Sequence, residues 1–114
     1  YDLRFPVFAR NTDRYDLLLC VANWPKPRIQ AWNALLRARA IENMAFAVGV
    51  NRTGKDPYRI QYPGASAAYD MLGNELLFLN SQTDMGQLTL DKELLYTTRE
   101  KLPFLDDRDA FTLG

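Results

Sequence analysis

The sequence predicts a mixed α+β fold in which helices cover one face of a sheet. Changes in hydrophobic period indicate this class. Apolar residues are continuous over Leu17–Ala22, recur three or four apart over Pro27–Met44, and alternate with small residues over Met44–Val50. A strand, a helix and a second strand in this order are typical of a right-handed βαβ crossover with parallel strands.

Local signals predict each element of this unit. Phe5–Asn11 is expected to form a short helix, since its second residue is a proline, which suits the first helical turn. The continuous apolar run at 17–22 predicts a strand buried on both faces. Pro27 stands where a helix begins, and the small residues within 44–50 indicate close neighbours on the second face of that strand.

Hairpins and a last helix are predicted downstream. Residues 51–57 are rich in turn formers, and Ala65–Met71 and Leu76–Leu79 have the pattern of a β-hairpin. Met85–Leu90 is expected to add a strand and Lys92–Arg99 a helix with Asp91 as its N-cap. The tail from 101 to 114 is expected to be irregular. The other face of the sheet is also apolar, so we expect it to need a partner layer.

The composition excludes several classes of function. The 114 residues carry 14 basic and 14 acidic side chains, a net charge of zero, one cysteine and no histidine. Balanced charge argues against a nucleic-acid or anionic-membrane binder. Without histidine there is no Ser-His-Asp or Cys-His set, and we expect neither a metal nor a cofactor. A lone cysteine closes no internal disulfide, so a cytoplasmic location is expected.

Three residues near the end of the first strand are candidate functional residues. Cys20 lies within the apolar run and has no adjacent cation, so we interpret it as a buried structural thiol. Asn23 and Trp24 leave the C-terminal end of a buried strand, where open α/β sheets place ligand contacts. They could form a pocket wall, or a turn whose indole caps the core.

Other polar residues receive weaker functional interpretations. Arg4 could bind a substrate carboxylate or pair with an acid and fix its loop, and Asn51 has a secondary claim to a site role. Arg39 and Glu42, three apart on the long helix, are expected to form an intrahelical ion pair. The acidic tail residues are interpreted as solvated or as contacting another subunit rather than as a metal cluster: Asp106, Asp107 and Asp109.

Five motifs, in order, resemble the carbon–nitrogen hydrolase (nitrilase) superfamily and most of all its omega-amidase branch. They begin at Tyr1, Ala22, Arg37, Asn51 and Tyr62, and read YDLRFP, ANWP, RARAIEN, NRTG and YPGAS. Each motif alone is weak, but five at compatible spacing, on the expected elements, make a specific signal. The likeness covers nearly the whole chain.

The resemblance implies a fold and a reaction. The fold is the C-terminal half of a four-layer αββα sandwich, so residues 1–114 are expected to be the C-terminal part of a single carbon–nitrogen hydrolase domain. In the family the nucleophilic cysteine immediately precedes the position of Tyr1, and a glutamate and a lysine lie further upstream. The implied reaction is hydrolysis of the omega-amide of a 2-oxo acid such as 2-oxoglutaramate, which releases ammonia through a cysteine thioester.

The resemblance also implies residue roles and partners. The backbone N–H of Tyr1 is expected to face the oxyanion, and Asn23 and Trp24 to contact the small-molecule amide substrate. The expected partners are the N-terminal part of the same domain and further copies in a homodimer or higher homo-oligomer. Two alternatives stay open: an N-carbamoyl or aliphatic amidase, and a non-catalytic nitrilase-like scaffold. The candidate subunit surface comprises the tail and three helix residues: Ile29, Trp32 and Leu36.

Overall fold

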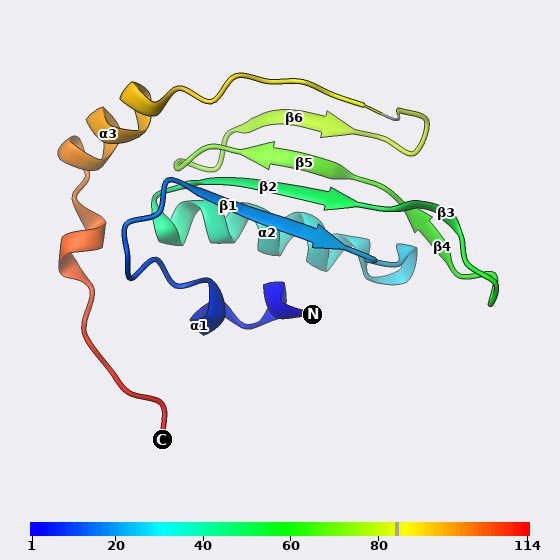
Figure 1. Cartoon of the computed structure of the whole chain (residues 1–114), viewed down its shortest axis with the longest axis horizontal. Helices are drawn as coiled ribbons and strands as arrows, with labels where there is room; N and C mark the ends of the chain where they lie inside the picture. The colour runs from blue at the N-terminus through cyan, green and yellow to red at the C-terminus, as the bar shows by residue number, and fades with distance from the viewer. Residues whose placement is uncertain (84) are drawn as a thin grey trace.

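One long helix lies along a four-stranded sheet in the computed structural model, which describes residues 1–83 and 85–114 (Figure 1). The elements, with 3-10 helices labelled η, are η1 (Asp2–Arg4), α1 (Pro6–Ala9), β1 (Leu17–Ala22), η2 (Lys26–Arg28), α2 (Ile29–Asn43), β2 (Phe46–Asn51), β3 (Thr53–Lys55), β4 (Gln61–Pro63), β5 (Ser66–Tyr69), β6 (Glu75–Leu79), α3 (Lys92–Lys101) and η3 (Phe104–Asp107). The predicted mixed α+β class is confirmed.

The sheet has the strand order β1-β2-β5-β6. β1 and β2 are parallel and joined by α2, which confirms the predicted βαβ unit. β5 and β6 add antiparallel, as the predicted hairpin requires. In the parallel pair Leu17 lies opposite Phe46 and Ala22 opposite Asn51. The C-terminal ends of both strands therefore meet at one edge of the sheet.

α2 packs closely on this sheet because β2 carries a glycine beneath it. A Cβ on Gly49 would lie 2.5 Å from Leu36 Cδ2 and 2.6 Å from Trp32 Cζ2. The predicted close neighbours of this strand are confirmed. Trp32 and Leu36 are fully buried within the chain, so their assignment to a subunit surface was wrong. Only the half-buried Ile29 of that helix set retains accessible surface.

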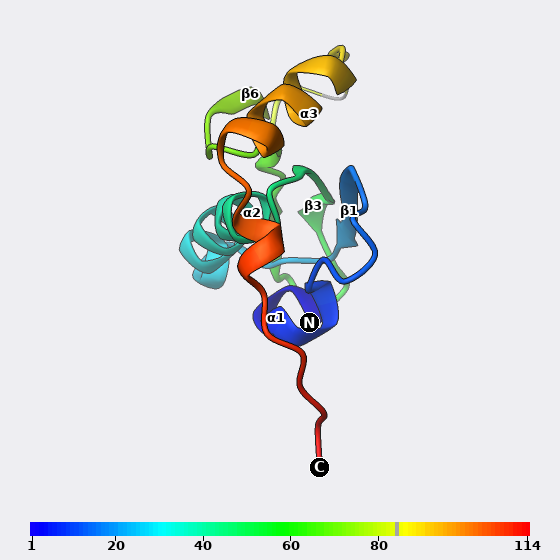
Figure 2. The same ribbon diagram turned by 90° about the vertical axis from the view of Figure 1, so that its left-hand side faces the viewer.

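The face of the sheet opposite α2 is open to solvent near the C-terminal ends of β1 and β2. Leu19, Val21 and Val50 are 66%, 83% and 50% exposed. The prediction that β1 is buried on both faces is wrong within this chain, since α2 lies on one side of it (Figure 2). The sequence signal was still meaningful, because an apolar run that faces open space is a surface for a further layer.

α3 and η3 cover the other end of that face. Met44, Phe46, Met71, Leu95 and Leu105 form a second buried cluster there. Asp91 caps α3 as predicted, its side chain accepting a hydrogen bond from the backbone N of Leu94. The tail is therefore not wholly irregular, although its last residues extend away from the sheet (Figures 1 and 2).

Two segments differ from the predictions. Residues 85–90 form no strand; a Cβ on Gly86 would lie 2.8 Å from Leu79 Cδ2, so the segment crosses the side chains of β6 instead of pairing with its edge. The second difference is the hairpin β3–β4, which begins within the turn-rich stretch 51–57 and for which no strands were predicted. Its turn is built by Asp56, whose Oδ1 accepts hydrogen bonds from the backbone N of Tyr58 and Ile60.

Candidate functional site

The N-terminal turn lies against the C-terminal end of β1. Leu3 and Trp24 belong to one buried cluster, and the Arg4 guanidinium lies over the Trp24 ring with its Cζ 5.0 Å from the ring centroid. The structure thus brings together two sets of predicted site residues, the turn that starts at Tyr1 and the corner at Asn23 and Trp24. Arg4 stacks on an aromatic ring, which neither sequence interpretation of it had included.

Backbone hydrogen bonds and one arginine define the N-terminal turn. The backbone N of Arg4 donates to Tyr1 O over 3.1 Å, and that of Phe5 donates to Asp2 O over 3.0 Å. The carbonyl oxygen of Leu3 accepts a hydrogen bond from Arg39 Nη2 at 2.6 Å. The Tyr1 side chain is 86% exposed, so the turn is held through residues 3 and 4 rather than through the tyrosine ring.

Trp24 and Asn23 differ in exposure. Trp24 is 5% exposed, its Nε1 donates to the Arg28 carbonyl over 2.6 Å, and its ring centroid lies 5.6 Å from that of Trp32. Asn23 is exposed. The indole therefore supports the corner from within the core, while the asparagine presents a polar side chain to solvent beside it.

Asn51 fixes this corner from the end of β2. The side chain is buried; its Oδ1 accepts a hydrogen bond from Trp24 N at 2.6 Å, and its Nδ2 donates to Trp24 O at 2.9 Å and to Gly64 O at 2.8 Å. One amide group therefore satisfies three backbone groups on two connections. Asn51 acts on the geometry of the corner, a role that sequence analysis had ranked as secondary.

Arg39 forms the predicted ion pair and one further contact. Its Nη1 lies 2.9 Å from Glu42 Oε1, which confirms the expected intrahelical pair. The guanidinium also reaches Leu3, although Arg39 is only 4% exposed. No local sequence signal links the two residues, because 36 positions separate them.

Cys20 faces the core cluster from β1 and is only partly exposed. Burial raises the pKa of its thiol above the usual value. A raised pKa leaves less thiolate at neutral pH, and the thiolate is the reactive form. These observations favour the interpretation of Cys20 as a structural thiol.

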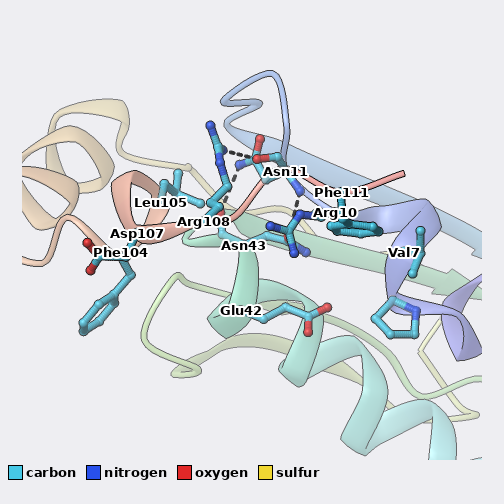
Figure 3. A pocket seen from close by; sticks show the side chains of 11 residues that line it. Val7, Arg10, Asn11, Glu42, Asn43, Phe104, Leu105, Asp107, Arg108 and Phe111 are labelled. Atoms are coloured by element: carbon cyan, nitrogen blue, oxygen red, sulfur yellow. Dashed lines mark hydrogen bonds between the residues drawn. The ribbon is translucent and has the colours of Figure 1, made fainter. Parts of the chain in front are cut away.

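A separate cavity of about 300 Å³ lies at the other edge of the sheet (Figure 3). It is bounded by α1, the end of α2 and the C-terminal segment. Asn11 is buried there; its backbone N donates to Asn43 Oδ1 over 2.9 Å, and Arg108 donates to its carbonyl oxygen. These contacts tie the chain to itself, and none of the predicted site residues lines the cavity.

The acidic tail residues also contact the chain itself. Asp106 pairs with Arg14, and Arg10 Nη2 donates to the Asp109 carbonyl over 2.7 Å. Within residues 1–83 and 85–114, no group of three or more histidine, cysteine or acidic side chains could hold a metal ion. None of the helices in that same part of the chain is long and apolar enough to cross a membrane.

The sequence matches a known protein family over most of its length. The family model described as carbon-nitrogen hydrolase matches residues 1–100. The chain is 47% identical to the omega-amidase YafV of Yersinia enterocolitica, over 99% of this chain and 44% of that protein. It is 39% identical to the 2-oxoglutaramate amidase of Paenarthrobacter nicotinovorans, over 96% of this chain and 38% of that protein.

A solved structure has the same fold. XC1258 from Xanthomonas campestris, a CN-hydrolase superfamily protein with an arsenic adduct in its active site, superimposes with a TM-score of 0.95 at 44% identity. The match covers all of this chain and 46% of that one, so the chain spans less than half the length of these relatives. With the family model and the relatives in agreement, the chain belongs to the carbon–nitrogen hydrolase family.

Proposed function

We propose that the chain is the C-terminal part of a single carbon–nitrogen hydrolase domain that hydrolyses the omega-amide of a 2-oxo acid. The substrate is a small molecule such as 2-oxoglutaramate, and the products are ammonia and the corresponding dicarboxylate. The observation that carries the proposal is that two relatives named for this chemistry each align with more than nine-tenths of the chain, at 47% and 39% identity.

The reaction needs an activated nucleophile because an amide is a poor electrophile. In the proposed mechanism a cysteine immediately before Tyr1 loses its proton to a glutamate and attacks the amide carbon. The tetrahedral adduct collapses as the glutamate returns the proton to the leaving nitrogen, which releases ammonia and leaves a thioester. Water, activated by the same glutamate, then hydrolyses the thioester. A lysine and backbone N–H groups stabilise the oxyanion.

This chain contributes the wall of that site in the proposal. The backbone N–H of Tyr1 donates to the oxyanion, and Asn23 and Trp24 form the substrate-facing corner. The contact between Arg4 and Trp24 supports this assignment, since it sets the turn after the nucleophile against that corner. The buried position of Trp24 limits its role to shaping the wall, and Asn23 supplies the polar contact.

We also propose that the protein is a cytoplasmic homodimer or higher homo-oligomer. The core position of Trp32 and Leu36 removes them from the contact surface. Ile29 and the C-terminal segment remain, and Phe111 and Leu113 of that segment are 52% and 71% exposed.

The deciding experiment measures ammonia release by the full-length protein. We expect turnover of 2-oxoglutaramate to exceed that of an N-carbamoyl amine, a simple aliphatic amide and a nitrile. Deaminated glutathione is a further competitor, because a Dictyostelium discoideum relative 31% identical to this chain is named as an amidase of that compound. Its amide nitrogen belongs to a dipeptide, so its hydrolysis is measured by the release of the 2-oxo dicarboxylic acid instead of ammonia. No release from 2-oxoglutaramate would end the omega-amidase proposal, and preference for a competitor would redirect it within the family.

The non-catalytic alternative is tested by the residue before Tyr1. Peptide mass mapping after treatment with a thiol-alkylating reagent should show one rapidly modified cysteine at that position. Cys20 provides the internal comparison, since burial raises the pKa of its thiol and should slow its alkylation. A residue without sulfur at that position favours the scaffold.

A further inference from the structure

We propose that Arg39 is a positioning residue for amide hydrolysis, acting through the carbonyl oxygen of Leu3 on the backbone of Tyr1. The inference rests on the proposed function, because it assigns Arg39 to the oxyanion donor of that reaction. It goes beyond the family assignment by giving a role to a helix residue that touches no substrate.

The N-terminal turn is anchored through the residues that follow Tyr1. Tyr1 itself is exposed, so its N–H direction depends on how the next residues are held. The backbone satisfies Tyr1 O and Asp2 O within the turn, whereas Leu3 O accepts from the Arg39 guanidinium at 2.6 Å. This contact is a charge-assisted hydrogen bond, the stronger kind, and it ties the turn to the long helix.

The Arg39 guanidinium is buried. Arg39 is 4% exposed, and its Nε has no hydrogen-bond partner among the described residues. A buried guanidinium with an unsatisfied N–H carries a desolvation cost that its remaining contacts must offset. A role in holding the Leu3 carbonyl oxygen and the Glu42 carboxylate together would account for a charged side chain at this buried position.

The two terminal nitrogens of the Arg39 guanidinium bind two different groups. Nη1 binds Glu42 Oε1 at 2.9 Å while Nη2 binds Leu3 O, so the carboxylate orients the guanidinium toward the turn. A lysine offers a single flexible ammonium and cannot reproduce two separated donors in one plane. Arg39→Lys therefore keeps the positive charge but loses the planar arrangement of two donors.

The test compares Arg39→Met and Arg39→Lys with a matched control, Arg99→Met, in the full-length protein. Arg99 is also a largely buried arginine that binds backbone carbonyls, donating to Met44 O at 2.7 Å and Tyr15 O at 2.6 Å. Arg99 lies on α3, and the two carbonyl groups that it binds precede β1 and β2, at the opposite end of these strands from the candidate site. Both methionine variants lose a buried guanidinium, but only one loses the contact with the turn.

We expect Arg39→Met to lower kcat for 2-oxoglutaramate by about tenfold or more, with KM changed by less than about threefold, because misplacement of a reacting group lowers the rate rather than ground-state binding. Arg39→Lys should fall between this variant and the wild type. Arg99→Met should keep kcat within about twofold, at a temperature where every variant is folded.

Hydrogen exchange tests the anchoring without any turnover. The amides of residues 2–5, 7 and 8 should exchange faster in Arg39→Met than in either the wild type or Arg99→Met. Equal exchange in all three proteins would overturn the inference even if no amide is hydrolysed. If the wild type turns over and both methionine variants lose kcat equally, Arg39 is only structural. If Arg39→Met does not fold, the same measurements on Arg39→Lys and Glu42→Gln decide the question.

Discussion

The side-chain oxygen of Asn51 accepts a hydrogen bond from the backbone N of Trp24 at 2.6 Å, across 27 residues of sequence. The same amide donates to Trp24 O and Gly64 O. The ends of β1 and β2 and the entry to β5 are therefore joined by one side chain. A binding wall at this corner depends on that buried amide as much as on the residues that face the substrate.

Replacing Asn51 with leucine should destabilise the full-length protein strongly. The change leaves two carbonyl groups and one N–H without partners in a buried place, and we expect a loss of about 2–4 kcal/mol in the free energy of unfolding. Chemical denaturation measures it. The control is Asn33→Ala, since Asn33 Oδ1 has no partner among the described residues. Its effect should be close to zero, and equal losses in both variants would contradict the role given to Asn51.

The backbone beneath α2 gives a second prediction. Gly49→Ala should cost about 1–3 kcal/mol, because the added methyl group enters space held by Leu36 and Trp32. Thermal or chemical unfolding measures this. Adding Leu36→Val should recover part of the loss, since the Cδ2 atom nearest to the new methyl group is removed. Losses that simply add would show that the cost of Gly49→Ala does not come from this contact.

How much of this structure the sequence predicted depends on the range of each signal. The βαβ unit, the β5–β6 hairpin and the cap at Asp91 follow from local period and turn chemistry, and all are present. Residues 85–90 were also predicted to form a strand from their residue pattern, but they form none. A segment that lies over the side chains of β6 and a segment that pairs with its edge can carry the same residue types, so local pattern does not separate them.

The sequence nominates the residues of the candidate site, whereas their contacts are seen only in the structure. Motif resemblance directed attention to Tyr1, Asn23 and Trp24, whereas the pairing of Arg39 with Leu3 arises only when α2 crosses the N-terminal turn. The stacking of Arg4 on Trp24 has the same origin. Contacts between residues so far apart in the chain are set by tertiary packing, which local sequence patterns do not display.

Tyr15 predicts a loss of stability at high pH. Burial, with a smaller contribution from the Glu42 carboxylate, raises the pKa of the Tyr15 phenol from 10.0 to about 12. Its stabilising effect is complete below pH 10, where the phenol is protonated in both states, and is lost as the pH rises toward 12, because the unfolded chain releases the proton first. The free energy of unfolding should therefore decline between these values.

The check compares wild type with Tyr15→Phe over that pH window. The phenylalanine variant should be less stable at neutral pH, since the Tyr15 hydroxyl also donates to the Ala9 carbonyl, but should lack this part of the pH dependence. Tyr58→Phe is the control because Tyr58 is 85% exposed. An identical decline in all three proteins would assign the effect to other groups, such as the lysines.

The open face of the sheet yields a prediction with opposite outcomes in two molecules. Leu19 is 66% exposed in this chain, yet in the proposed four-layer domain it faces a second sheet. Residues 1–114 produced alone should therefore aggregate through this face, and Leu19→Lys should raise the concentration at which the isolated segment stays in solution. In the full-length protein the same change buries an unpaired ammonium and should cost more than about 3 kcal/mol in the free energy of unfolding.

The control is Gln30→Lys, which adds the same charge at an exposed helix position and should change the behaviour of neither molecule much. A freely soluble, cooperatively melting monomer of residues 1–114, or a full-length protein indifferent to Leu19→Lys, would show that no second sheet covers this face.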